Sequence, residues 1–200
     1  EPLNTTKKRQ KRSVSPDALN LGATPDPARL RRLVLLRRDG TNTGLAPITT
    51  PEAIVEIVPQ TSSLVMLENP MLTLANTIDA CGGAFALHYS EIADHLDTLD
   101  ELLASDLPAA PEPVHHPYVA GRSPVGAEWA RREWSDAVQY DDQVVVLAGT
   151  NAHLLTGLGT TMWLTLAETT ELDALVETAT EIHGPHPEAK ALVEAALEEL

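Results

Sequence analysis

The hydrophobic period of the chain changes once in its C-terminal third, and this change constrains the fold most. Apolar residues first come in three short runs of strand length, at residues 137–140, 144–147 and 152–155. Beyond Thr156 they recur at helical spacing until the chain ends. The pattern predicts three short antiparallel strands followed by three helices, which is an α+β arrangement.

Turn and cap residues separate these elements. Asp141-Asp142 is expected to join the first two strands, and residues 148–151 the second and third. We expect Thr156 and Thr170 to cap the first two helices, because a hydroxyl accepts from the free amides of a first turn. Residues 126–200 therefore have a winged-helix-like order of elements.

The first half of the chain mixes both periods over shorter stretches. Strands are predicted at residues 30–38 and 84–89, and helices at 50–58, 70–81 and from Ser90 onward. Thr50 is the expected cap of the first of these helices, with Pro51 at its first position. Residues 1–106 thus form a small αβ module that begins with a basic tail.

A proline-rich stretch follows this module. Pro108, Pro111, Pro113, Pro117 and Pro124 are expected to prevent a regular strand ladder, so residues 107–125 are interpreted as an extended linker. His115 and His116 lie within it. Neighbouring side chains diverge and no Cys or carboxylate stands at ligand spacing, so they are assigned to a solvated loop and no metal site is expected.

Charge is segregated along a chain of net charge −15. Ten of its fourteen Lys and Arg residues lie in residues 1–40, and twenty-five of its twenty-nine acids lie in residues 41–200. So acidic a body repels phosphate and anionic lipid, and we expect neither a nucleic-acid nor a membrane partner. The basic stretch 7–12 is interpreted as a solvated tail, with a nucleic-acid patch as the alternative.

Catalytic signatures do not occur in the sequence. There is no Gly-x-Ser-x-Gly elbow, and the histidines fall mostly at element ends or in the linker. Cys81 is the single cysteine, so an internal disulfide is excluded and a reducing, cytoplasmic setting is expected. No apolar run approaches the roughly 20 residues of a membrane span. We therefore expect a protein that is not an enzyme and holds no cofactor.

Several landmarks of residues 126–200 resemble the PqqD family of precursor-recognition domains. They are the Tyr140-Asp141-Asp142 turn, the valine-rich second strand, the 152–155 strand, Trp163, and the His186-Pro187-Glu188 helix start. The resemblance implies capture of a ribosomally made leader peptide beside the third strand, and its delivery to a modifying enzyme. Carried over to this chain, the peptide-binding residues are Ala152, His153, Leu154, Leu155, Ala189, Leu192, Val193 and Ala196.

Three alternatives remain open at this point. Taken individually, Leu192 and Leu197 of the last helix are interpreted as core residues rather than as groove residues, and the open sheet edge also permits a homodimer. Residues 14–19, 33–38, 59–62 and 87–92 resemble the C-terminal part of HPr-kinase-like P-loop proteins. None of the four lysines follows a glycine, as a P-loop requires. The alternative function is thus a regulatory or structural portion of such a protein, with its nucleotide-binding half absent.

Overall fold

The structure is a computed structural model that describes residues 18, 29–38, 44–108, 111–121 and 123–199. The chain divides into two compact units, 1–30 and 31–200. Only Ala18, Arg29 and Leu30 of the first unit are described, so the basic stretch 7–12 lies outside the described residues. The second unit, residues 31–200, holds both of the larger sheets and all of the α-helices of the described residues.

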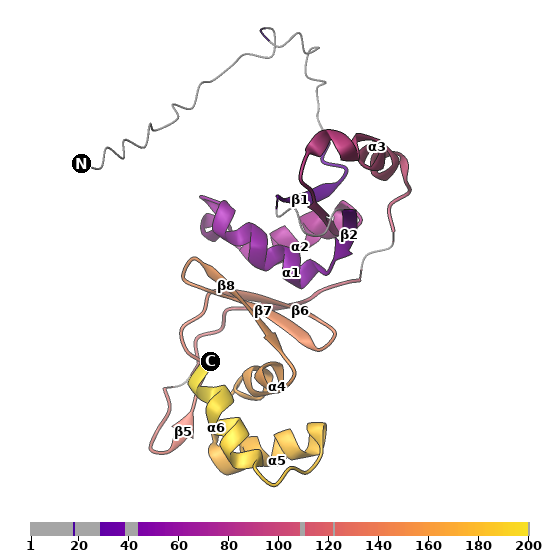
Figure 1. Cartoon of the computed structure of the whole chain (residues 1–200). Coiled ribbons are helices and arrows are strands. Elements are labelled where there is room, and N and C mark those ends of the chain that lie inside the picture. Colours follow the sequence, from indigo (N-terminus) through magenta and orange to yellow (C-terminus); the bar gives the residue numbers. More distant parts are fainter. Residues whose placement is uncertain (1–17, 19–28, 39–43, 109–110, 122, 200) are drawn as a thin grey trace, which may run out of the picture. The chain divides into compact units, whose positions relative to one another are not determined.

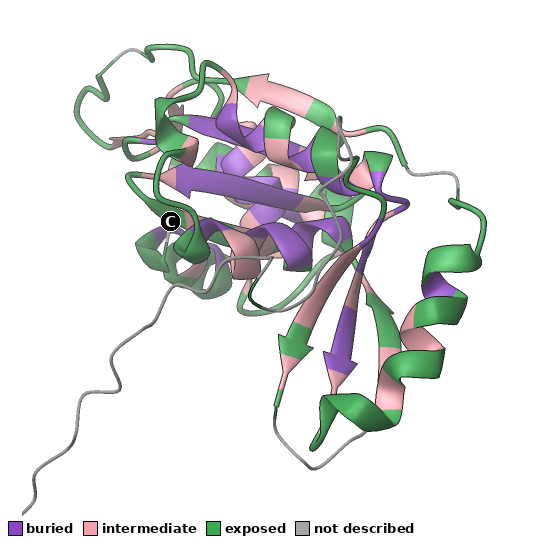
Figure 2. Cartoon of the chain, turned by 90° about the horizontal axis from the view of Figure 1, so that it is seen from above, coloured by how far each residue is buried: buried purple, intermediate pink, exposed green. Residues whose placement is uncertain are grey.

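The first sheet has three strands in the order β1-β3-β2. Strand β1 (Leu33–Arg37) runs parallel to β3 (Ala84–His88), and β2 (Gly44–Ile48) runs antiparallel to it. Figure 2 shows this sheet splayed to one side, with its most buried residues on the central strand β3. The predicted strands at 30–38 and 84–89 are therefore present, with an additional strand, β2, between them in the sequence.

Three helices belong to the same half of the chain. They are α1 (Thr50–Ile57), α2 (Pro70–Ala80) and α3 (Leu96–Ala104), with 3-10 turns at Val58–Gln60, Leu64–Met66 and Ile92–His95. The cap of α1 is Thr49 rather than the predicted Thr50, and it forms a capping box with Glu52. Hydrogen bonds from the backbone and side chain of Thr49 lower the pKa of Glu52.

The second sheet has four antiparallel strands in the order β4-β6-β7-β8. They are β4 (Val114–Pro117), β6 (Asp136–Tyr140), β7 (Gln143–Ala148) and β8 (Asn151–Thr156). Two-residue turns join β6 to β7 and β7 to β8, and both begin at positive φ, 50° at Asp141 and 58° at Gly149. Strands β5 (Glu128–Trp129) and β9 (Thr170–Glu171) form a separate small pair.

Strand β4 corrects the prediction of a linker without a ladder. Residues 114–117 pair with β6, and His115 and His116 are half-buried rather than solvated. The strand lies at an edge of its sheet. Pro117 at its last position has no backbone N–H, and an edge strand tolerates this because one of its sides has no neighbouring strand to bond. Proline content alone therefore did not exclude pairing here.

Three helices follow β8, as predicted. They are α4 (Leu158–Thr165), α5 (Leu172–His183) and α6 (Ala189–Glu199). The predicted threonine caps are wrong, because Gly157 and Glu171 occupy the cap positions and neither makes a side-chain cap. Gly157 is at φ 51°, a conformation in which a bulkier residue would be strained. The α+β class is confirmed, whereas the winged-helix comparison stays a prediction.

The four-stranded sheet β4-β6-β7-β8 is covered on both faces (Figure 1). On one face Val138, Tyr140, Val145 and Leu147 form a single core with α1 and α2. On the other face Ala137, Val144 and Val146 pack against Trp134 and Trp163, beyond which α4, α5 and α6 build their own core. The 107–125 segment therefore does not separate two packing units. No helix among the described residues has both the length and the apolarity to cross a bilayer.

Candidate functional site

Strand β8 ends its sheet and has one unpaired side. It pairs with β7 only, and its other edge has no strand partner among the described residues. Ala148 and Asn151 close a two-residue turn, which makes them a hydrogen-bonded pair. Because bonded and non-bonded pairs alternate, Ala152 and Leu154 turn their amides and carbonyls away from β7. The edge therefore offers two donors and two acceptors to an incoming strand.

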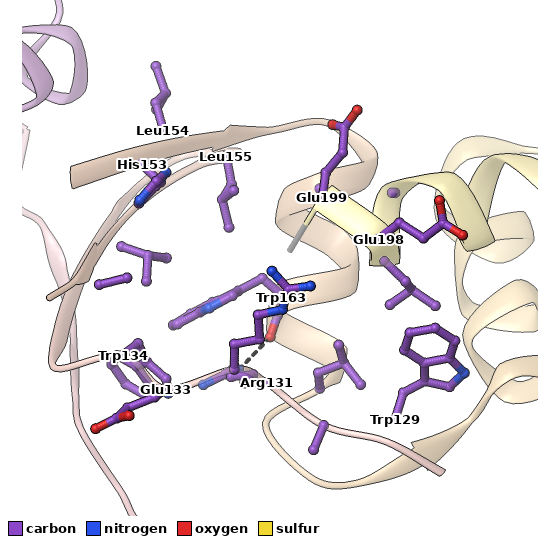
Figure 3. Close-up of a pocket in the computed structure, with 18 of the residues that line it drawn as sticks. Trp129, Arg131, Glu133, Trp134, His153, Leu154, Leu155, Trp163, Glu198 and Glu199 are labelled. Carbon is purple, nitrogen blue, oxygen red and sulfur yellow. Dashed lines mark hydrogen bonds between the residues drawn. The ribbon is translucent and has the colours of Figure 1, made fainter. Parts of the chain in front are cut away.

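The side chains of β8 alternate between the two faces of the sheet. Ala152 and Leu154 pack against the core shared with α1 and α2. His153 and Leu155 lie on the opposite face, where Leu155 contacts the cluster around Trp163. Figure 3 shows Leu154 pointing away from the cavity and Leu155 pointing toward Trp163.

A cavity of about 820 Å³ lies along β8, and we call it the β8 groove. Its walls are residues 129–134, β8, the α4 region at Gly159, Trp163 and Leu166, and the end of α6 from Ala196 to Glu199. It is open to solvent and mixes apolar and charged side chains (Figure 3). A volume of this size is in the range of ligand-binding clefts.

Aromatic rings form the floor of the groove. Trp134 and Trp163 are both buried and meet edge to face, with ring centroids 5.2 Å apart. His116 of β4 lies against Trp163 at 5.5 Å, and Tyr118 lies against Trp134 at 5.6 Å. This packing fixes the floor, so the groove exists without an occupant to shape it.

Arg131 is the charged group held most firmly in the groove. Its guanidinium carbon is 3.6 Å from the centroid of the Trp163 ring, and Nε donates to the Trp163 carbonyl at 2.7 Å. A longer bond of 3.3 Å runs from Nη2 to the Leu164 carbonyl. Burial lowers the pKa of Arg131 to about 10, so the side chain stays cationic at neutral pH. Glu133, Glu198 and Glu199 contribute exposed carboxylates to the rim.

No protein-family model, curated protein or solved structure matches this chain. Its function is therefore inferred from its own geometry.

The structure brings together five of the eight residues predicted for a peptide site. Ala152, His153, Leu154, Leu155 and Ala196 line the β8 groove. The other three lie elsewhere on α6. Val193 is buried in the helical core, Leu192 is 46% exposed, and Ala189 is half-buried at the start of the helix. Within the described part of α6, only the last turn, from Ala196 to Glu199, lines the groove.

Sequence reasoning missed the 129–134 wall. The sequence patterns assigned no role in a site to Trp129, Arg131 or Trp134. The available signal was charge, because Arg131, Arg132 and Lys190 are the only basic residues from Gly126 onward. A cation that is partly buried needs a compensating contact, and the rings of Trp163 and Trp134 supply one for Arg131.

Two other polar clusters lie between the sheet and α2. Asp136 is 2% exposed and its Oδ1 lies 2.7 Å from His115 Nε2. Tyr140 donates to Asp79 Oδ2 at 2.6 Å, and burial followed by this bond raises the pKa of the Tyr140 hydroxyl. The described residues contain no group of three or more potential metal ligands. Cys81 is buried, which raises the pKa of its thiol.

Proposed function

We propose that this chain binds the leader part of a ribosomally synthesised precursor peptide without catalysis and presents it to a peptide-modifying enzyme in the cytoplasm. The peptide adds as a strand beside β8. The observation that carries the proposal is an unpaired edge strand forming one wall of a preformed groove. Strand addition takes its affinity from main-chain hydrogen bonds and its specificity from side-chain pockets, and this site offers both.

The groove suits an extended chain. Alternate residues of an added strand face the same side as Leu155, so they would meet Trp163 and the end of α6. Ala196 is small enough at this point to leave room for an apolar side chain of the peptide. Main-chain pairing would use the outward groups of Ala152 and Leu154.

The test needs the full chain, because the sheet shares a core with α1 and α2 and residues 126–200 alone would expose it. The probes are a displayed library of random 12-residue peptides and synthetic peptides from short reading frames beside the gene. Leu155→Asp and Ala196→Arg should each weaken binding at least tenfold with an unchanged circular dichroism spectrum. Ala195→Arg is the matched control, since Ala195 is exposed and lies outside the groove.

Two results would refute the proposal. One is that neither set of probes yields a binder. The other is that peptides bind equally well to both groove variants and to the Ala195→Arg control. A second copy of the chain could also pair with β8. Sedimentation of the free protein tests this, because such pairing would give a dimer that dissociates when peptide is added.

A further inference from the structure

We infer that the peptide in the β8 groove carries a carboxylate that pairs with Arg131. This inference rests on the proposed function and adds the chemistry by which the groove selects its occupant. The carboxylate belongs either to an Asp or Glu side chain or to the C-terminus of the peptide.

The guanidinium of Arg131 is fixed before any ligand arrives. Its Nε and Nη2 bond the carbonyls of Trp163 and Leu164 in the last turn of α4, where a cation also suits the negative end of the helix. Stacking on Trp163 and a second ring, Trp134, at 5.5 Å restrict the remaining freedom. A side chain held in this way loses little entropy when it binds a ligand.

The free donors of Arg131 face the groove. An arginine has five N–H donors in a planar fork, and the two carbonyl bonds to α4 use one on Nε and one on Nη2. Nη1 makes no hydrogen bond to any of the described residues. Every buried side-chain nitrogen or oxygen of these residues has a hydrogen-bond partner, so an unbonded Nη1 must be exposed to solvent. The Nη1–Nη2 edge is one that can hold a carboxylate by two parallel bonds.

No carboxylate of the described residues already takes this place. The ion pairs among the described residues involve cations other than Arg131. Glu133, Glu198 and Glu199 line the same groove without forming an ion pair with Arg131. A role as a cap for α4 explains Nε and Nη2 but leaves Nη1 and the remaining hydrogen on Nη2 unexplained. A ligand carboxylate satisfies both.

The three rim glutamates limit how many acidic residues the bound peptide can carry. They repel a peptide rich in acidic residues, so the groove favours a single carboxylate with neutral or basic neighbours. An added strand places every second side chain on the groove side. The expected pattern is therefore one acidic residue separated by an even number of positions from an apolar residue that packs near Leu155.

The experiment is a double-mutant cycle with the full chain and the 12-residue peptides that the library yields. Replacing the acidic residue of the peptide by its amide should weaken binding to the native protein by about tenfold to a hundredfold, as expected for a charged hydrogen-bond pair. The same replacement should change binding to Arg131→Gln by less than about twofold. Arg38→Gln removes an equal charge outside the groove and should leave the peptide effect intact.

Two further arms keep the result decisive. Peptides with a free or an amidated C-terminus distinguish the two sources of the carboxylate. Should Arg131→Gln fail to fold, the acid-to-amide comparison on the native protein still tests the inference, because unchanged binding there would overturn it. Two results would overturn the inference while leaving strand addition in place. One is that peptides without a carboxylate bind. The other is that the acid-to-amide replacement weakens binding equally in the native and Arg131→Gln proteins. Absence of any binder would instead refute the proposed function.

Discussion

The carboxylate of Asp136, at the start of β6, accepts a hydrogen bond from the backbone amide of Met71 in α2 at 2.8 Å. Asn69 occupies the cap position of α2 but makes no side-chain cap, so a residue 65 positions beyond Met71 serves the first turn instead. The same carboxylate contacts His115 of β4 and the Ala137 amide. One buried side chain thereby ties α2 to the sheet that carries the groove.

Asp136→Ala is expected to lower the free energy of unfolding by about 2–3 kcal/mol, because it leaves a buried helix amide and a half-buried histidine without their acceptor. Urea denaturation monitored by tryptophan fluorescence measures the change. Asp142→Ala, an exposed residue of the β6–β7 turn, is the control and should shift stability by less than about 0.5 kcal/mol. Equal effects of the two substitutions would contradict the capping role.

Tyr140 gives the fold a specific sensitivity to alkali. Burial and the bond to Asp79 raise the pKa of its hydroxyl, so above pH of about 10 the unfolded chain releases this proton while the folded chain keeps it. The folded state then binds more protons, and stability falls with rising pH by up to about 1.4 kcal/mol per unit. Thermal melts between pH 8 and 11 should show a steeper loss for the native protein than for Tyr140→Phe. Parallel curves would contradict this account.

The β6–β7 turn stores strain at one residue. Asp141 is the only non-glycine at positive φ among the described residues, in the first position of a two-residue turn where glycine is preferred. Asp141→Gly should therefore raise the unfolding free energy by about 1 kcal/mol. Asp142→Gly, whose φ is not positive, should give no gain. Chemical denaturation of both variants decides the point, and a gain only at Asp142 would refute it.

The strand order of the C-terminal half was predictable because local signals agreed. Valine-rich runs, the Asp141-Asp142 turn and helical spacing after Thr156 each indicate the observed elements. The packing partner of the sheet also left a signal in the sequence. The four consecutive apolar residues from Val144 to Leu147, all buried in the structure, are typical of a strand covered on both faces, which implies a second layer such as α1 and α2.

The groove itself was only partly accessible to sequence reasoning. The β8 residues and Ala196 came from a family resemblance, whereas Arg131, Trp134 and the last glutamates of α6 meet there through tertiary packing. The 129–134 wall is largely irregular chain with no hydrophobic period. Its position depends on Arg131 bonding α4 and on Trp134 packing beside Trp163, contacts that link residues about 30 positions apart.

Amide hydrogen exchange at Ala152 and Leu154 tests strand addition at β8 most directly. In the free protein these amides should exchange faster than the amide of His153, which bonds β7. A bound peptide should slow exchange at Ala152 and Leu154 by at least tenfold and leave His153 nearly unchanged. Tight peptide binding without added protection at these two amides would contradict the account.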